Sequence, residues 1–131
     1  MDDYTRRTLD DMLETMRQAK GIGLAATQIG LLHRMIVADI GEGEVELINP
    51  VIYFQEGEAI AEEGCLSLPG IRIPVRRALR IGVSGLNRYG EPVDLTLENL
   101  LARVIQHEVD HLDGVLIKDH QETKVMVSEQ P

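Results

Sequence analysis

The sequence has no tryptophan, one phenylalanine and one cysteine in 131 residues. Because aromatic residues make up only 3% of the chain and apolar residues 44%, the core must be packed from leucine, isoleucine, valine, alanine and methionine. A lone cysteine excludes an internal disulfide. Cys65 is therefore a buried apolar side chain, a reactive thiol or a metal ligand.

Long hydrophobic runs are also lacking. No stretch approaches the roughly 18 apolar residues of a membrane span, and no signal-peptide pattern opens the chain. The formal charge of -9 argues against a nucleic-acid or anionic-membrane binder, since either would need a basic surface. We expect a cytoplasmic protein that contacts neither nucleic acid nor membrane. Its length predicts one domain spanning residues 1–131.

The pattern of apolar residues predicts a helix, several strands and a second helix. Helical spacing extends over residues 2–20 and again over about 97–112, where Thr96 is the expected N-cap and Gly114 the stop. Strands are expected at 34–40, 45–54, 71–75, 79–86 and 93–97. Because helices do not alternate with these strands, the fold class is α+β. The segment 21–30 is small and glycine-rich, which indicates a loop or strand approached closely by another group.

The second predicted helix carries the main chemical signal. His107 and His111 are four residues apart, so their imidazoles project from one helix face. This spacing lets two nitrogens bind one metal ion, with Glu108 beside the metal-bound water. The alternative is two solvated histidines. The same face continues with Leu100 and Val104, however, and should point inward, where unpartnered polar side chains are costly.

A catalytic metal site usually has three protein ligands and an open position. One candidate for the third ligand is Glu122, the glutamate that follows the helix in a polar tail. The other is Cys65, in the tight segment Glu63-Gly64-Cys65-Leu66-Ser67. A thiolate would favour a softer metal than magnesium or calcium. The local context favours Cys65.

Two other functions fit the same helix. A metallopeptidase or amidase with another substrate could use the same histidines, with Glu122 as third ligand. A structural zinc held by Cys65, His107 and His111 is the second alternative. Structural zinc usually takes four protein ligands, and the sequence offers no further cysteine or nearby histidine, so catalysis is favoured.

Three segments together carry a family resemblance. The segments 21–28 (GIGLAATQ), 63–67 (EGCLS) and 106–111 (QHEVDH) are similar, in order, to the three signature motifs of the peptide deformylases. The similarity extends from the first helix to about Lys118. It implies a compact domain with antiparallel β-sheets around a central C-terminal helix. It also implies an enzyme that hydrolyses the N-formyl group of formylmethionyl nascent peptides and releases formate.

The resemblance also implies a set of site residues. Metal ligands would be Cys65, His107 and His111, with Glu108 as general acid and base. The side-chain amide of Gln28 and the backbone N–H of Leu66 would stabilise the oxyanion. The family characteristically uses Fe²⁺ and accepts Zn²⁺, Ni²⁺ or Co²⁺.

Substrate-binding positions follow from the same motifs. Ile22, Gly23 and Gly64 resemble positions that hold an extended peptide by main-chain hydrogen bonds. Arg72 lies where the family often has an arginine near the substrate backbone, although a solvated arginine at a strand edge is an equal alternative. Arg103 would lay its stem along the pocket and keep its charged head in water. The wall of the methionine pocket resembles five positions: Ile22, Ala61, Leu100, Arg103 and Val104.

Two departures from the family pattern concern the chain ends. Family members commonly carry about two dozen residues before the first helix, so we expect a strand edge or apolar patch to be exposed here. Bacterial cellular members dock on the ribosome with a basic C-terminal helix. In this chain Lys118 and Lys124 are offset by Asp119, Glu122 and Glu129, which argues against that docking mode. The short form is similar to minimal versions carried by some bacteriophages, and we expect a monomer.

Overall fold

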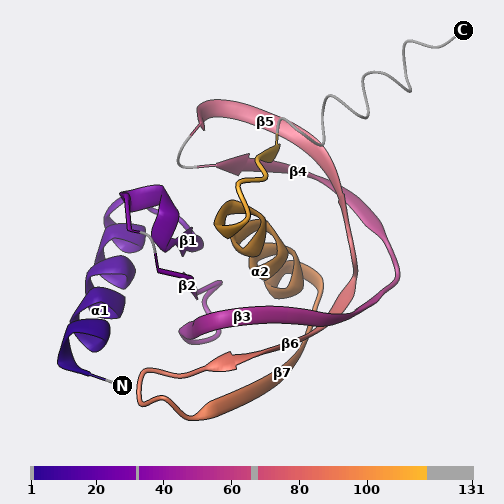
Figure 1. Ribbon diagram of the computed structural model, residues 1–131. Coiled ribbons are helices and arrows are strands. Elements are labelled where there is room, and N and C mark those ends of the chain that lie inside the picture. The colour runs from indigo at the N-terminus through magenta and orange to yellow at the C-terminus, as the bar shows by residue number, and fades with distance from the viewer. Residues whose placement is uncertain (1, 32, 66–67, 118–131) are drawn as a thin grey trace, which may run out of the picture.

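The computed structural model describes residues 2–31, 33–65 and 68–117, with backbone alone for Cys65, Leu68, Pro69 and Ile71. Figure 1 shows helix α2 enclosed between a hairpin on one side and a larger sheet on the other, with α1 outside the sheet. The elements are, in chain order, α1 (Asp3–Gln18), β1 (Gly23–Ala25), the 3-10 helix η1 (Ala26–Ile29), β2 (Met35–Ala38), β3 (Val45–Glu56), β4 (Ala59–Cys65), β5 (Leu68–Arg77), β6 (Arg80–Leu86), β7 (Pro92–Glu98) and α2 (Asn99–Leu112).

The strands form two antiparallel sheets. The larger has five strands in the order β1-β2-β3-β6-β7, and the smaller consists of β4 and β5. Strand β3 is long and its pairing with β6 shifts register twice, between Ile48 and Val51 and between Ile52 and Phe54. Such bulges bend a strand and increase its twist. The bend lets the larger sheet curve around α2, as Figure 1 shows.

Helix α1 begins and ends as its sequence indicates. The Asp2 side chain accepts a hydrogen bond from the Thr5 backbone N–H at 2.9 Å, which caps the first turn. At the other end Lys20 adopts a left-handed conformation, φ 58°, and the Gly21 N–H bonds back to the Met16 carbonyl at 2.9 Å. The buried face of α1 comprises Thr8, Leu9, Met12, Leu13 and Met16.

The core lies on both faces of the larger sheet. All four residues of β2 are buried, and alternate residues point to opposite faces. Met35 and Val37 join the cluster around α1, whereas Ile36 and Ala38 join the cluster around α2. Strands β1 and β2 are therefore buried on both faces, and α2 packs against one of these faces.

Helix α2 starts later than its sequence pattern predicts. The expectation of Thr96 as N-cap is wrong, because Thr96 pairs with Gly82 in the ladder between β6 and β7. Strand β7 continues to Glu98, which occupies the N-cap position. Leu100 is 49% exposed, so the inward face begins with Ala102, Val104 and Ile105 rather than Leu100.

The α+β fold with antiparallel sheets around a C-terminal helix is confirmed. Among the described residues, no helix is long and apolar enough to cross a membrane. The tail from Lys118 onward, including Glu122, and the oxyanion candidate Leu66 lie outside the described residues.

Candidate active site on helix α2

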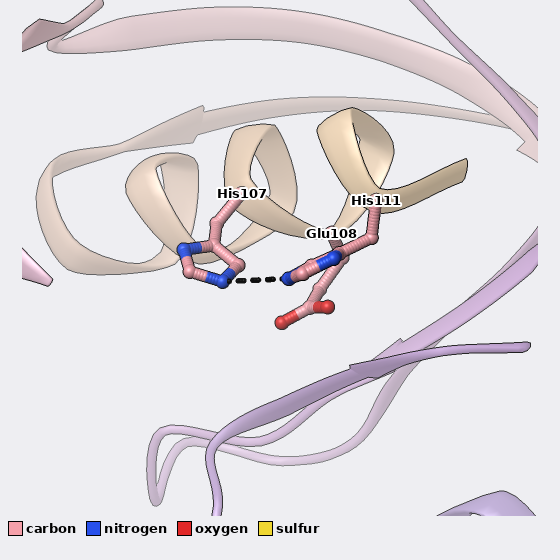
Figure 2. A group of neighbouring side chains, drawn as sticks. All are labelled: His107, Glu108 and His111. Atoms are coloured by element: carbon pink, nitrogen blue, oxygen red, sulfur yellow. Dashed lines mark hydrogen bonds between the residues drawn. The ribbon is translucent and has the colours of Figure 1, made fainter. Parts of the chain in front are cut away.

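Three buried polar side chains on one face of α2 form the centre of the site. His107, Glu108 and His111 are 8%, 5% and 7% exposed. Figure 2 shows the two imidazoles facing each other, with the Glu108 carboxylate on the same side of the helix. The Nε2 atoms of His107 and His111 are 3.1 Å apart. The spacing of four residues has therefore brought two imidazole nitrogens close together, as the sequence predicts.

The donor atoms fit a single metal ion. Two imidazole nitrogens bound tetrahedrally at about 2.0–2.1 Å from one zinc-like ion lie about 3.3 Å apart, close to the observed separation of the Nε2 atoms. One ligand atom from each of His107, Glu108 and His111 lies within 4.8 Å of the others. Nitrogen donors suit zinc and the later transition metals better than magnesium or calcium.

A buried glutamate on β4, in the hairpin formed by β4 and β5, orients His107. The Oε1 atom of Glu63 lies 2.7 Å from Nδ1 of His107. A carboxylate is an acceptor, so Nδ1 donates in this bond. In the neutral imidazole this leaves the lone pair that a metal ion needs on Nε2. This is the arrangement by which carboxylates commonly fix the tautomer and ring orientation of metal-binding histidines.

Two arginines hold Glu63 in its charged form. Arg77 donates from Nη2 to Oε1 at 2.9 Å and from Nε to Oε2 at 3.0 Å, and Arg103 donates from Nη1 to Oε2 at 2.5 Å. Burial alone would raise the pKa of Glu63. Hydrogen bonds from His107, Arg77 and Arg103 outweigh it and lower the pKa from 4.5 to about 2. Arg77 also pairs with Asp110 on α2.

Glu108 lies against the backbone of β1. A Cβ atom added to Gly23 would be 2.5 Å from Oε2 of Glu108 and 2.7 Å from Cγ1 of Val104. Because real Cβ atoms do not approach so closely, any larger residue here would force the side chains of Glu108 and Val104 to move. Gly23 thus brings the backbone of β1 beside the carboxylate, which accounts for the glycine at this position.

The amide of Gln28, which lies in the 3-10 helix η1, is held by the last residue of β1. Its Oε1 accepts a hydrogen bond from the Ala25 N–H at 2.8 Å. The amide therefore presents its NH₂ group, a hydrogen-bond donor, on the other side. The 3-10 helix η1 is also bonded to α2, because Thr27 Oγ1 donates to the His111 carbonyl at 3.2 Å.

This geometry agrees with comparisons to known proteins. The sequence profile of the polypeptide deformylase family matches residues 1–126. The chain belongs to the polypeptide deformylase family. It is 52% identical over 113 residues to the peptide deformylase of Desulfitobacterium hafniense, covering 86% of this chain and 75% of that protein.

Solved structures show the same relationship. The crystal structure of the Thermotoga maritima peptide deformylase superposes with a TM-score of 0.89 at 47% identity, covering 91% of this chain and 82% of that one. A Synechococcus elongatus peptide deformylase in complex with actinonin gives 0.88 at 44% identity, covering 91% and 68%. The expectation of a peptide deformylase, an enzyme that removes the N-formyl group from nascent peptides, is therefore confirmed.

The residues expected in the methionine pocket of the deformylase are divided between buried and exposed positions. Val104 is 5% exposed and lies next to Gly23. Ile22 and Leu100 are 45% and 49% exposed, and Ala61 is exposed on β4. Ile22 immediately precedes β1, Ala61 lies on β4 and Leu100 lies on α2, the helix that carries the histidines.

Two arginines differ in their surroundings. Arg72 is exposed and pairs with Gly64 in the hairpin, where its Nη2 lies 3.4 Å from the Glu62 carbonyl oxygen. The expectation that Arg103 keeps its charged head in water is wrong. Its side chain is 13% exposed and its guanidinium binds Glu63 and two backbone carbonyls, because the hairpin lies over this turn of α2.

Sequence reasoning assigns no role to Glu63 or Arg77, although Glu63 opens the second motif. The signal that could have found Glu63 is general: a metal-binding histidine usually donates its second N–H to a carboxylate. Cys65 is the last residue of β4, two positions after Glu63 on the same strand. Its side chain lies outside the described residues.

Proposed function

We propose that this deformylase hydrolyses formylmethionyl peptides at a metal held by His107, His111 and Cys65. The observation that carries the assignment is the convergence of the two Nε2 atoms, 3.1 Å apart, beside the Glu108 carboxylate and the backbone of Gly23. Cys65 as the third ligand rests on its matching motif and on its place at the end of β4. We further propose that residues 1–131 act as one catalytic domain.

When bound by His107, His111 and Cys65, a metal ion would supply Lewis acidity, which would lower the pKa of a bound water and polarise the formyl carbonyl. We propose Fe²⁺ as the ion in the cell, with Zn²⁺, Ni²⁺ or Co²⁺ as alternatives. Donor chemistry supports this group of ions, because imidazole and thiolate suit transition metals.

Glu108 acts as general base and then as general acid. Its carboxylate accepts a proton from the attacking water as the carbon–oxygen bond forms at the formyl carbon. It then delivers that proton to the nitrogen of methionine as the carbon–nitrogen bond breaks. The products are formate and a peptide with a free amino terminus. Burial of Glu108 beside Gly23 keeps the carboxylate in one place during both transfers.

Negative charge develops on the formyl oxygen during the attack. The NH₂ group of Gln28 is a suitable donor to that oxygen, because the Ala25 N–H fixes the opposite end of the amide. The backbone N–H of Leu66 is proposed as the second donor from its motif position alone.

The peptide is proposed to bind in an extended conformation along β1. Within the described part of the chain, β1 is an edge strand of the larger sheet, and β4 has one unpaired edge in the two-stranded sheet. Backbone groups at Ile22, Gly23 and Gly64 would then pair with the substrate, which makes recognition independent of downstream side chains. Ile22, Ala61, Leu100 and Val104 are proposed to line the methionine pocket, and Arg72 to lie near the peptide backbone.

We also propose that the enzyme works in the cytoplasm as a monomer on nascent chains. Newly made formylated polypeptides would be its natural substrates, and docking on the ribosome through a basic terminal helix is not expected.

The test is formate release from formyl-Met-Ala-Ser under anaerobic conditions, with metal content measured in the same sample. Protein loaded with one iron or nickel ion is expected to release formate from this substrate. The matched control substrate is N-acetyl-Met-Ala-Ser, which carries a bulkier acyl group. No formate from fully loaded protein would contradict the proposal. The Cys65→Ala variant is expected to lose the metal, and full retention would exclude Cys65 as a ligand.

A further inference from the structure

Arg103 connects α2 to both strands of the β4–β5 hairpin. Nη1 donates to Oε2 of Glu63 at 2.5 Å and to the Val75 carbonyl at 3.0 Å. Nη2 donates to the Ala59 carbonyl at 2.9 Å. Three oxygens, on β4 and β5, are thus gathered by one planar guanidinium that projects from the helix one turn before His107.

The carboxylate that Arg103 binds is also the partner of His107. Oε1 of Glu63 lies 2.7 Å from Nδ1 of His107, while Oε2 takes the bond from Arg103. Arg103 and His107 are four residues apart on α2, so they lie on the same helix face. The two oxygens of the Glu63 carboxylate are therefore bound by side chains from two successive turns of α2, the helix that carries the proposed metal ligands.

Arg77 binds the same carboxylate but does not connect the hairpin to α2 in the same way. Arg77 is on β5 and Glu63 on β4, so their ion pair lies within the hairpin. In the described part of the chain, its ion pair with α2 is to Asp110, whose side chain is 28% exposed. More buried polar links run from α2 to the two strands of the hairpin through His107 and Arg103, which bind Glu63, and through the two carbonyl bonds of Arg103. Gln106 on α2 also bonds the backbone N–H and carbonyl of Ala78, the residue that follows β5.

We propose that Arg103 is a positioning residue for the metal centre. By binding Glu63 and the carbonyls of Val75 and Ala59, it holds the hairpin at a fixed distance from α2. This orients His107 and sets the spacing between the histidines and the strand that ends at Cys65. The inference rests on the proposed function, because it takes His107 and Cys65 as metal ligands.

The proposal differs from a role of Arg103 as pocket wall. A wall residue contributes through its apolar stem, and replacing it changes how the methionine side chain binds. A positioning residue acts through its hydrogen bonds, and replacing it changes how firmly the metal is held. Loss of such an outer partner typically costs about 10–100-fold in metal affinity or activity. Lysine offers one compact ammonium instead of a planar fork, so it should restore only part of the effect.

The experiment compares Arg103→Met, Arg103→Lys and wild type, each loaded anaerobically with one Co²⁺. Arg76→Met is the matched control, because Arg76 neighbours Arg77 on β5 but forms an exposed pair with Glu58. The readouts are the rate of Co²⁺ transfer to a chelator, the visible spectrum of the bound Co²⁺, and kcat and KM for formyl-Met-Ala-Ser. All are measured well below the lowest melting temperature.

We expect Arg103→Met to release Co²⁺ about 10-fold faster or more, with an altered spectrum, a lower kcat and a nearly unchanged KM. Arg103→Lys should fall between this variant and wild type, and Arg76→Met should match wild type. Unchanged release and spectrum, with or without a change in KM, would overturn the proposal. A changed KM would then assign Arg103 to the pocket wall.

Two further results keep the outcomes separate. If Arg103→Met does not fold, Arg103→Lys decides, and wild-type release and spectrum in that variant would overturn the proposal. Failure of the proposed function would be visible in the wild type itself, as the absence of stoichiometric Co²⁺ or of formate. That result is independent of the Arg103 variants.

Discussion

Replacing Glu63 by glutamine tests how the buried ion network supports the fold. Glu63 is 6% exposed, and its carboxylate is bound by Arg77, Arg103 and His107. Glutamine keeps the shape and one acceptor oxygen but removes the charge, which leaves both guanidinium groups poorly compensated. Removing one partner of a buried ion pair costs about 3–5 kcal/mol, and we expect the lower end, about 3 kcal/mol. For a chain of this size that corresponds to a Tm lower by roughly 10–15 °C.

Glu58→Gln is the matched control. Glu58 precedes the same strand and pairs with Arg76 at 2.9 Å, but the two side chains are 66% and 62% exposed. An exposed pair contributes about 0–1 kcal/mol, so its Tm should change by less than about 4 °C. The assay is thermal unfolding of the metal-free proteins followed by circular dichroism. Equal Tm changes in the two variants would refute the reasoning.

Three further predictions concern the site, the pH dependence and the core. Gly23→Ala places a Cβ 2.5 Å from Oε2 of Glu108. The rate of formate release should fall about 10-fold or more and the free energy of unfolding by about 1–3 kcal/mol, while the metal content stays unchanged. A wild-type kcat in this variant would contradict the prediction. The pKa of Glu63 is lowered to about 2 from 4.5, so its stabilisation is complete above about pH 4.5 and is lost as pH falls toward 2. The denaturant-midpoint gap between wild type and Glu63→Gln should therefore be constant at higher pH and narrow below it, and a gap that widens in acid would be inconsistent. Leu9→Ala should lower the free energy of unfolding by about 2–5 kcal/mol, because Leu9 is fully buried on the inner face of α1. The kcat of the folded protein should not change, because α1 packs on the sheet face opposite α2. Equilibrium unfolding and formate assays check the two expectations.

Elements with strong helical spacing could be predicted from sequence. The first helix, expected over residues 2–20, spans Asp3–Gln18 with Asp2 as its cap. Local signals suffice there, because the apolar stripe and the capping residue lie within one continuous segment. The start of α2 could not be located in this way. Thr96 is a good N-cap by type, but pairing of β7 with β6 outweighs that preference up to Glu98.

Strand β4 shows the limit of pattern reading in this chain. Its sequence from Ala59 to Cys65 contains two glutamates and a glycine, so it lacks the alternation of a half-buried strand. The strand exists because it pairs with β5 and because Glu63 faces two arginines and a histidine. Those partners are 14 to 44 residues away in sequence. Such contacts leave no local signal.

The site divides in the same way. The spacing of His107, Glu108 and His111 is a property of one helix, so the convergence of the imidazoles could be predicted directly. The contact of Gly23 with Glu108 and the binding of Arg103 to Glu63 depend on how separate elements pack. The resemblance to a family gives the identity of these positions but not the contacts of their side chains.

The central claim is that Glu108 transfers protons at a metal held by its two neighbouring histidines. The most direct measurement is the formate-release rate of Glu108→Gln and wild type, each with its metal content determined. We predict equal metal content and a rate at least about 100-fold lower in the variant, because general acid–base catalysis contributes about 10²–10⁴-fold. A variant that holds the metal and releases formate at the wild-type rate would contradict the account.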